Sequence, residues 1–140
     1  MQRKAVAIWQ GGLKTGKGTI STQSETLNDV QYSFSTRFEN GTGTNPEELI
    51  AAAHAGCFAM ALSAQLEGAG MKPEKLEVAA TVKLEKLESG WAVTESHLDL
   101  TANVPEADPD KFEACADAAK KGCPISKLLN TKITLTAKLD

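Results

Sequence analysis

The chain has 140 residues, 41% of them hydrophobic and 24% charged, with a formal net charge of −3 at pH 7, which predicts one folded domain over residues 1–140. The slightly acidic balance, without a basic cluster, argues against nucleic acid and anionic membranes as partners. No stretch reaches the roughly 18 apolar residues of a membrane span, and the first residues lack the apolar core of a signal peptide, so we expect a cytoplasmic protein.

The N-terminal third is predicted to form strands. Residues 4–9 and 17–22 flank a glycine-rich turn, and residues 31–38 alternate between apolar and polar side chains, as in a half-buried strand. Arg37 then lies near the end of this third strand, on the polar face. We expect a β-meander that ends in the loop 40–44.

A long alanine-rich helix is predicted to begin at Asn45. Asn45 is a suitable N-cap, Pro46 fits the first helical position, and Glu48 can complete a capping box. Small and apolar side chains follow around nearly the whole helix until Gly68, and such a helix is buried on several sides. Because only 5% of the residues are aromatic, we expect a second copy of the chain to complete the core.

The remaining residues predict a hairpin, a second helix and a last strand. Residues 76–84 and 91–104 form the hairpin, with a bulge in its return strand between Val93 and Leu98. The helix runs from Pro109 to Lys121, and the last strand covers 131–139. Strands, helix, hairpin, helix and strand in this order are typical of the α+β class.

Two of the three cysteines form a candidate reactive pair. Cys57 lies inside the long helix, where burial as a small hydrophobic residue is the default role. Cys123 is placed at the N-cap of a short helix that begins at Pro124, where backbone N–H groups favour a thiolate. Cys115 lies on the apolar face of its helix and is expected to pack in the core.

With only two histidines and no C-x-x-C pair, the sequence argues against a metal site. His54 lies one turn before Cys57 and suits either packing or a hydrogen-bond network. His97 is expected to be exposed.

A thiolate at Cys57 needs a cation, because the helix dipole has faded about a dozen residues into the helix. Arg37 is the first candidate and His54 the second, although a solvated strand residue is the simpler interpretation of Arg37. A charge pair at about 4 Å is worth roughly 4 kcal/mol at an effective dielectric near 20, which lowers a thiol pKa by up to about 3 units. Glu47 could hold the arginine, or could simply favour the helix N-terminus. Since Glu47 and Cys57 are about 15 Å apart along one helix, they share a site only if two helices cross.

The motifs TRFE at 36–39, GTNPEEL at 43–49, AAAHAGCFAM at 51–60 and GCPIS at 122–126 closely resemble those of the OsmC/Ohr family of peroxidases. The position of the arginine, just before the GTNPEEL loop, is closer to the OsmC branch. The resemblance covers essentially the whole chain.

This resemblance implies an intertwined homodimer with two central helices flanked by antiparallel sheets, and two sites at the subunit interface. It implies that Cys57 is the peroxidatic cysteine, Cys123 the resolving one, and Arg37 and Glu47 the activating pair, with no metal or organic cofactor. The substrate would be an organic hydroperoxide, favoured over hydrogen peroxide by an apolar pocket that includes Phe58 and Met60. A small dithiol or lipoyl-type molecule would be the reductant. The alternative is a non-catalytic redox-sensing or binding dimer with the same fold.

Overall fold

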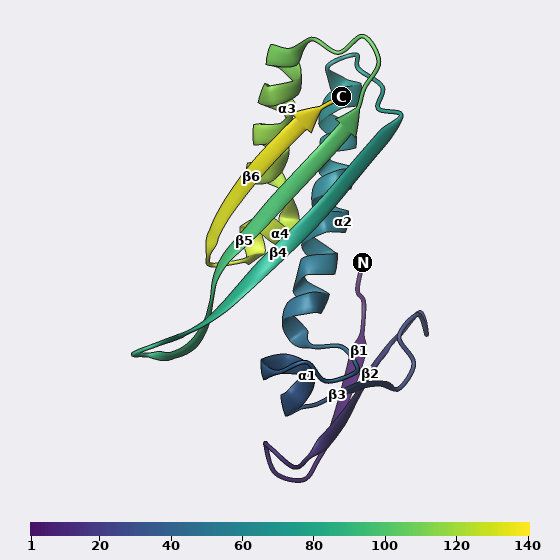
Figure 1. The fold of residues 1–140 in the computed structure, drawn as a ribbon. Coiled ribbons are helices and arrows are strands. Elements are labelled where there is room, and N and C mark those ends of the chain that lie inside the picture. The colour runs from purple at the N-terminus through teal and green to yellow at the C-terminus, as the bar shows by residue number, and fades with distance from the viewer. The chain divides into compact units, whose positions relative to one another are not determined.

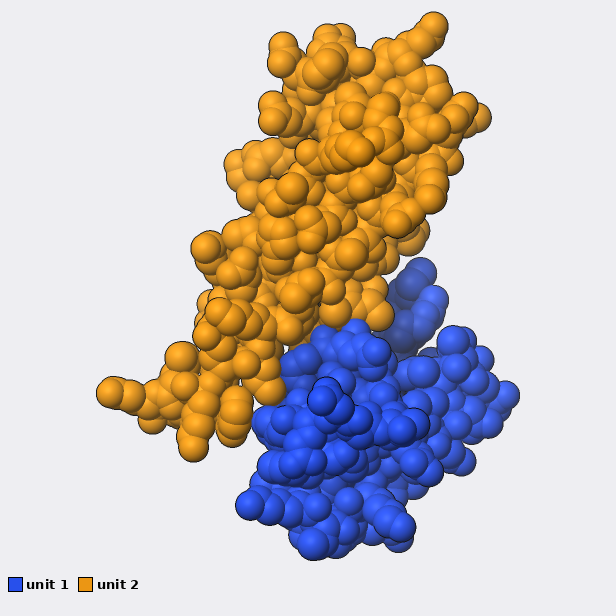
Figure 2. All heavy atoms as spheres, viewed as in Figure 1, with its two compact units in different colours: residues 1–49 blue, residues 50–140 orange.

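The computed structural model describes all 140 residues (Figure 1). The chain divides into two compact units, an N-terminal unit of residues 1–49 and a C-terminal unit of residues 50–140 (Figure 2). The division into two compact units does not test the prediction that residues 1–140 form one domain, which stays a prediction. The elements in chain order are β1 (Ala5–Gln10), β2 (Lys17–Thr22), β3 (Val30–Tyr32), α1 (Phe34–Phe38), α2 (Pro46–Gly68), β4 (Lys75–Leu87), β5 (Gly90–Asn103), α3 (Pro109–Gly122), α4 (Pro124–Leu128) and β6 (Lys132–Leu139).

The N-terminal unit contains the expected meander, with strand order β1-β2-β3 and antiparallel pairing throughout. Trp9 on β1 lies opposite Gly18 on β2, and its ring contacts Tyr32 on β3 with 5.4 Å between centroids. A Cβ on Gly18 would lie 2.3 Å from the Tyr32 ring and 2.8 Å from the Trp9 ring. A glycine is therefore required where the two aromatic rings cross β2.

The prediction of a strand over residues 31–38 is wrong, because the chain leaves β3 after Tyr32 and forms the short helix α1. The Ser33 side chain accepts from the Thr36 backbone N–H, and the Thr36 side chain accepts from the Ser33 backbone N–H, which completes a capping box. Phe34 and Phe38 then lie four residues apart, with ring centroids 4.8 Å apart. Local capping thus overrides the alternating pattern and places Arg37 on a helix.

The N-terminal unit buries no hydrophobic side chain fully, since every buried apolar residue belongs to the C-terminal unit. Val6 and Ile8 on β1 are 48% and 52% exposed, and Leu13 is 67% exposed. A unit of this size with an uncovered apolar strand has little hydrophobic stabilisation of its own. In a stable protein, another surface has to cover β1.

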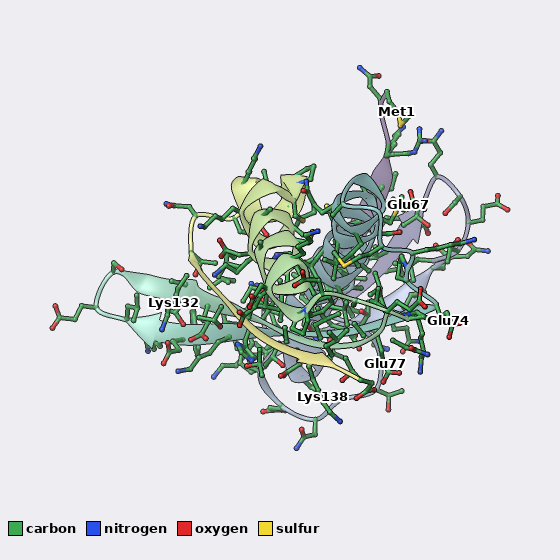
Figure 3. The ribbon with its side chains drawn as sticks, turned by 90° about the horizontal axis from the view of Figure 1, so that it is seen from above. Met1, Glu67, Glu74, Glu77, Lys132 and Lys138 are labelled. Carbon is green, nitrogen blue, oxygen red and sulfur yellow. The ribbon has the colours of Figure 1, made fainter.

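The C-terminal unit packs α2 and α3 on one face of a sheet of order β4-β5-β6 (Figure 1). Seen from above, Glu77 and Lys138 extend on the opposite side of the sheet from the helices (Figure 3). The β4–β5 pair is antiparallel, with the register shifted at Lys83 and Leu84, so the predicted bulge lies at Thr94 of β5. The α+β class is confirmed, although β5 and β6 pair in parallel rather than in the expected antiparallel way.

The core of this unit lies between α2, α3 and the sheet. Phe58, Leu62 and Leu66 recur every four residues on α2 and are fully buried. They join Leu98, Leu100 and Ala102 of β5 and the α3 residues Phe112, Cys115, Ala116 and Ala119. The core role predicted for Cys115 is confirmed.

The helix predicted from Asn45 is confirmed as α2. The Asn45 side chain accepts from the Glu48 backbone N–H at 2.8 Å, while the Glu48 carboxylate accepts from the Thr44 hydroxyl. One face of α2 is buried as expected, but the opposite face, including Ala53, Gly56 and Met60, is exposed in the single chain.

By length and composition α2 is apolar enough to cross a membrane, contrary to the expectation from sequence. Core helices of globular proteins meet the same criterion. The fully buried imidazole of His54 on α2 is hydrogen-bonded to side chains of β5 and α4. Within this structure α2 packs one face against the sheet and leaves the other exposed.

Candidate active site

The structure brings Cys57 and Cys123 together, although 66 residues separate them in the sequence. Cys57 lies in the middle of α2, and Cys123 is both the C-cap of α3 and the N-cap of α4, as the sequence predicts for its N-cap. Their sulfur atoms share a hydrogen bond at 2.9 Å, and both thiols are free. A disulfide needs the sulfurs only to move from this distance to about 2.05 Å.

The two thiols differ in acidity. Burial raises the pKa of the Cys57 thiol, and its hydrogen bond with Cys123 raises that pKa further. Burial also opposes ionisation of Cys123, but the hydrogen bond with Cys57 and the donors of Ser126 and Ile125 outweigh it, so the pKa of Cys123 is lowered. The structure has the Cys123 thiol as donor and the Cys57 sulfur as acceptor in this bond, although a thiol can take either role. Because the donors of α4 converge on Cys123, we assign the shared proton to Cys57.

Cys123 is therefore the more acidic thiol in the isolated chain. The short helix α4 forms no regular side-chain cap bond at Cys123, so the N–H groups of Ile125 and Ser126 act on the sulfur at longer range. In the C-terminal unit the backbone N–H of Ile125 favours a thiolate at Cys57, but burial and the hydrogen bond with Cys123 outweigh it, so the pKa of Cys57 stays raised. A thiolate at Cys57 therefore needs a cation nearby.

His54 belongs to a hydrogen-bond network rather than to apolar packing. Its Nδ1 lies 2.6 Å from Ser96 Oγ on β5, and its Nε2 lies 2.7 Å from Ser126 Oγ on α4. His54 and Ser96 are fully buried, and burial lowers the pKa of the imidazole, which keeps it neutral. No sequence motif links Ser96 and Ser126 to His54, because the partners lie 42 and 72 residues away.

In the N-terminal unit, the structure brings Arg37 and Glu47 together as an ion pair. Arg37 Nε lies 3.1 and 3.2 Å from the two Glu47 carboxylate oxygens, and Arg37 Nη2 lies 2.8 Å from Oε1. Glu47 is buried, whereas the Arg37 side chain is 40% exposed. The carboxylate thus fixes one edge of the guanidinium, and the other edge retains N–H donors for a ligand.

A pocket of about 280 Å³ lies beside this ion pair. Apart from Arg37, its walls are mainly apolar or aromatic; they include Trp9, Leu13, Phe34, Phe38 and Pro46. The prediction that Phe58 lines the substrate pocket is wrong, because Phe58 faces the sheet and is fully buried in the core. Met60 is 77% exposed on α2 and lines neither this pocket nor the wider one.

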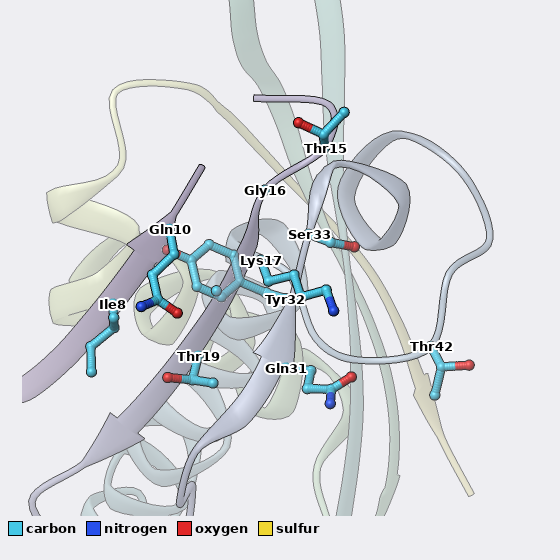
Figure 4. A pocket seen from close by; sticks show the side chains of 11 residues that line it. Ile8, Gln10, Thr15, Gly16, Lys17, Thr19, Gln31, Tyr32, Ser33 and Thr42 are labelled. Atoms are coloured by element: carbon cyan, nitrogen blue, oxygen red, sulfur yellow. The ribbon is translucent and has the colours of Figure 1, made fainter. Parts of the chain in front are cut away.

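A wider pocket of about 480 Å³ opens elsewhere in the N-terminal unit (Figure 4). Neutral polar side chains surround the Tyr32 ring, and Lys17 is the only charged residue that lines it. No cysteine, histidine or carboxylate faces this space. It therefore offers no thiol, imidazole or carboxylate for chemistry.

The other chemistry-bearing residues lie outside these sites. His97 is half-buried rather than exposed as expected, because it packs between Thr134 and Thr136 of β6. No group of three or more His, Cys, Asp or Glu side chains is arranged to hold a metal ion.

Comparisons with known proteins agree on one family. The family model for OsmC-like proteins matches residues 39–138. The chain is 47% identical to peroxiredoxin OsmC of Escherichia coli strain K12 over 139 residues, covering 99% of this chain and 97% of that protein. It is 30% identical to an organic hydroperoxide resistance protein of Xanthomonas axonopodis pv. citri, covering 71% of this chain and 68% of that protein. The crystal structure of the organic hydroperoxide resistance protein OhrB of Bacillus subtilis matches with a TM-score of 0.68 and 27% identity, covering 98% of both chains.

Proposed function

From the premise that this chain belongs to the OsmC-like family, we propose that it is a thiol-dependent peroxidase that reduces organic hydroperoxides to alcohols. The observation that carries the proposal is the pair of free thiols, Cys57 and Cys123, with sulfurs 2.9 Å apart. One thiol can take an oxygen atom from the peroxide, and the other can then remove it.

In the first step, the Cys57 thiolate attacks the outer peroxide oxygen and the O–O bond breaks. Cys57 becomes a sulfenic acid, and the alkoxide leaves and takes a proton to become the alcohol. Arg37 donates hydrogen bonds to the peroxide oxygens, where negative charge develops as the bond breaks. Glu47 holds Arg37 in position for this role, which the ion pair between them supports.

In the second step, Cys123 attacks the Cys57 sulfur and water leaves, which forms the Cys57–Cys123 disulfide. A small dithiol or lipoyl-type reductant then restores both thiols. Because this last step needs a reducing environment, we expect the enzyme to act in the cytoplasm.

The pocket beside Arg37 supports an organic substrate. Trp9, Phe34 and Phe38 offer an apolar surface of alkyl or aryl size, while the guanidinium can bind the peroxide group. Hydrogen peroxide has no apolar part to place there, so it should react less well.

The site requires a homodimer in this proposal. Glu47 and Cys57 lie ten residues apart on α2, about 15 Å along a straight helix, so Arg37 and Glu47 would reach the partner subunit's Cys57. The exposed stripe of Ala53, Gly56 and Met60 on α2 supports close contact between two copies of this helix. The uncovered apolar residues of β1 support the same assembly.

The variant Gly56→Leu tests this helix contact. A side chain at Gly56 meets open space in the single chain, so leucine should be tolerated there and favour the helix. In a close-packed dimer, the same side chain would overpack the seam and raise the dimer dissociation constant about tenfold or more. Analytical ultracentrifugation measures this change. Gly68→Leu, at the end of the same helix and also in open space, is the matched control; equal behaviour of the two variants would argue against the seam.

One equivalent of an alkyl hydroperoxide tests the proposed function. We expect mass spectrometry to find a disulfide between Cys57 and Cys123 after this single equivalent. In a second assay, with hydroperoxide and a dithiol both in excess, we expect alcohol to form in many turnovers. A redox sensor would form the disulfide without sustained turnover. A binding dimer would form neither the disulfide nor the alcohol. The sensor result and the binding-dimer result would each contradict the proposed enzyme.

A further inference from the structure

The network around His54 connects the two thiols through a second pair of residues. His54 precedes Cys57 by one turn of α2, and Ser126 follows Cys123 by one turn of α4. The two pairs face each other, because the sulfurs lie 2.9 Å apart and His54 Nε2 lies 2.7 Å from Ser126 Oγ. The bond between His54 and Ser126 therefore ties α4 to α2 at the point where Cys123 must approach Cys57.

The direction of the hydrogen bonds follows from the chemistry of the partners. A neutral imidazole has one donor and one acceptor nitrogen. Ser126 lies three residues after Cys123 at the start of α4, so its hydroxyl proton is free to turn towards the Cys123 sulfur if the oxygen accepts its other bond from His54 Nε2–H. His54 Nδ1 is then the acceptor, and it receives the Ser96 hydroxyl proton. With this assignment Ser96 donates to His54 and His54 donates to Ser126, which leaves the Ser126 hydroxyl proton for the Cys123 sulfur.

We propose that His54 is a positioning residue for the resolving step, in which Ser96, His54 and Ser126 form a relay of hydrogen bonds that stabilises the Cys123 thiolate. Ser96 fixes the tautomer of His54, and His54 turns the Ser126 hydroxyl towards the sulfur. This inference rests on the proposed function, because it concerns the attack of Cys123 on oxidised Cys57.

The step balances without a further reactant. Cys123 releases its proton, and the thiolate attacks the Cys57 sulfur of the sulfenic acid. The S–O bond breaks, and the leaving hydroxide takes up a proton to become water as the S–S bond forms. The relay stabilises the thiolate from which this attack starts.

Few other groups can account for the acidity of Cys123. The elements packed against it contribute Cys57 and His54 from α2, Ser96 from β5, and the backbone carbonyl of Ala119 from α3. The nearby lysines of α3, Lys120 and Lys121, pair with Asp117, and Lys127 of α4 is exposed. Hydrogen bonds rather than a cation therefore set the ionisation of Cys123.

The variant Ser126→Ala tests the relay. After one equivalent of hydroperoxide, the rate of disulfide formation is followed by rapid quenching across pH, and trapping with a sulfenic-acid reagent reports the first step. We expect disulfide formation to slow about tenfold at pH 7, as the loss of a hydrogen bond to a charged group predicts, and its pH midpoint to rise. Sulfenic acid formation should keep its rate. Ser126→Thr, which retains a hydroxyl, should restore the midpoint.

Ser96→Ala is the sharper variant, because its hydroxyl contacts His54 and neither thiol. Ser96→Ala should raise the pH midpoint of disulfide formation by less than Ser126→Ala does. In a chain that already carries Ser126→Ala, it should cause no further rise in this midpoint. Thr134→Ala, which removes a hydroxyl bonded to the other histidine, is the matched control and should leave the midpoint unchanged.

The outcomes separate the two proposals. If the unaltered protein forms neither sulfenic acid nor disulfide, the proposed function is wrong. If it forms both, and Ser126→Ala or Ser96→Ala slows the reaction equally at every pH or leaves the midpoint unchanged, the relay is wrong and the network is only structural.

Discussion

Replacing Cys57 by serine is expected to reduce the turnover of an alkyl hydroperoxide to the rate measured without protein. The serine hydroxyl is nearly isosteric with the thiol, but it is not ionised at neutral pH and is a poor nucleophile towards a peroxide oxygen. Because Cys57 is half-buried and a serine hydroxyl can also bond with Cys123 and with the Ile125 backbone N–H, the fold should tolerate the change. The assay measures alcohol formation with a dithiol in excess, and circular dichroism checks the fold.

Cys115→Ser is the matched control for this loss. Cys115 is buried, and its thiol is bonded to the Gln65 carbonyl at 3.5 Å in the core, away from the two reactive sulfurs. We expect this variant to be somewhat less stable but active. If Cys57→Ser retained turnover and Cys115→Ser lost it, Cys115 rather than Cys57 would be the reactive cysteine.

The reach of sequence reasoning differs between elements of this chain. Where periodicity and caps agree, as in α2 and α3, the boundaries are correct to within one residue, and Cys123 is found at the N-cap of α4. At residues 31–38 the alternating pattern competes with the capping box of Ser33 and Thr36. The local hydrogen bonds win, and the S-x-x-T spacing is the signal that would have indicated it.

The site was predictable only where motifs carry it. The two cysteines and the Arg37–Glu47 pair follow from the residues and the family resemblance, and the structure brings each pair together. The network of His54 with Ser96 and Ser126 could not be found in this way, because β5 and α4 meet α2 only in the folded chain. The pocket was misplaced for a related reason: Phe58 repeats with Leu62 and Leu66, and this repeat buries it in the core.

Replacing Arg37 by alanine is expected to raise the pKa of the Cys57 thiol and to slow its oxidation at neutral pH. In the single chain, burial already raises that pKa, so a thiolate at pH 7 depends on a cation, which Arg37 supplies in the proposed dimer. A guanidinium at about 4 Å can lower a thiol pKa by up to about 3 units. Without it, each unit by which the pKa of Cys57 rises above 7 reduces the thiolate fraction at pH 7 about tenfold. The midpoint for alkylation of Cys57 should therefore move to higher pH.

The titration has to isolate Cys57, because two thiols 2.9 Å apart ionise as a coupled pair. We would measure alkylation in a chain whose Cys115 and Cys123 are both serine, with and without Arg37→Ala. Arg37→Lys keeps the charge but loses the fork that matches the Glu47 carboxylate, so its midpoint should lie between the two. Arg3→Ala, at the exposed N-terminus, is the control for loss of one positive charge. A midpoint that stays in place in Arg37→Ala would remove Arg37 from the activation of Cys57, while the disulfide chemistry of Cys57 and Cys123 could still stand.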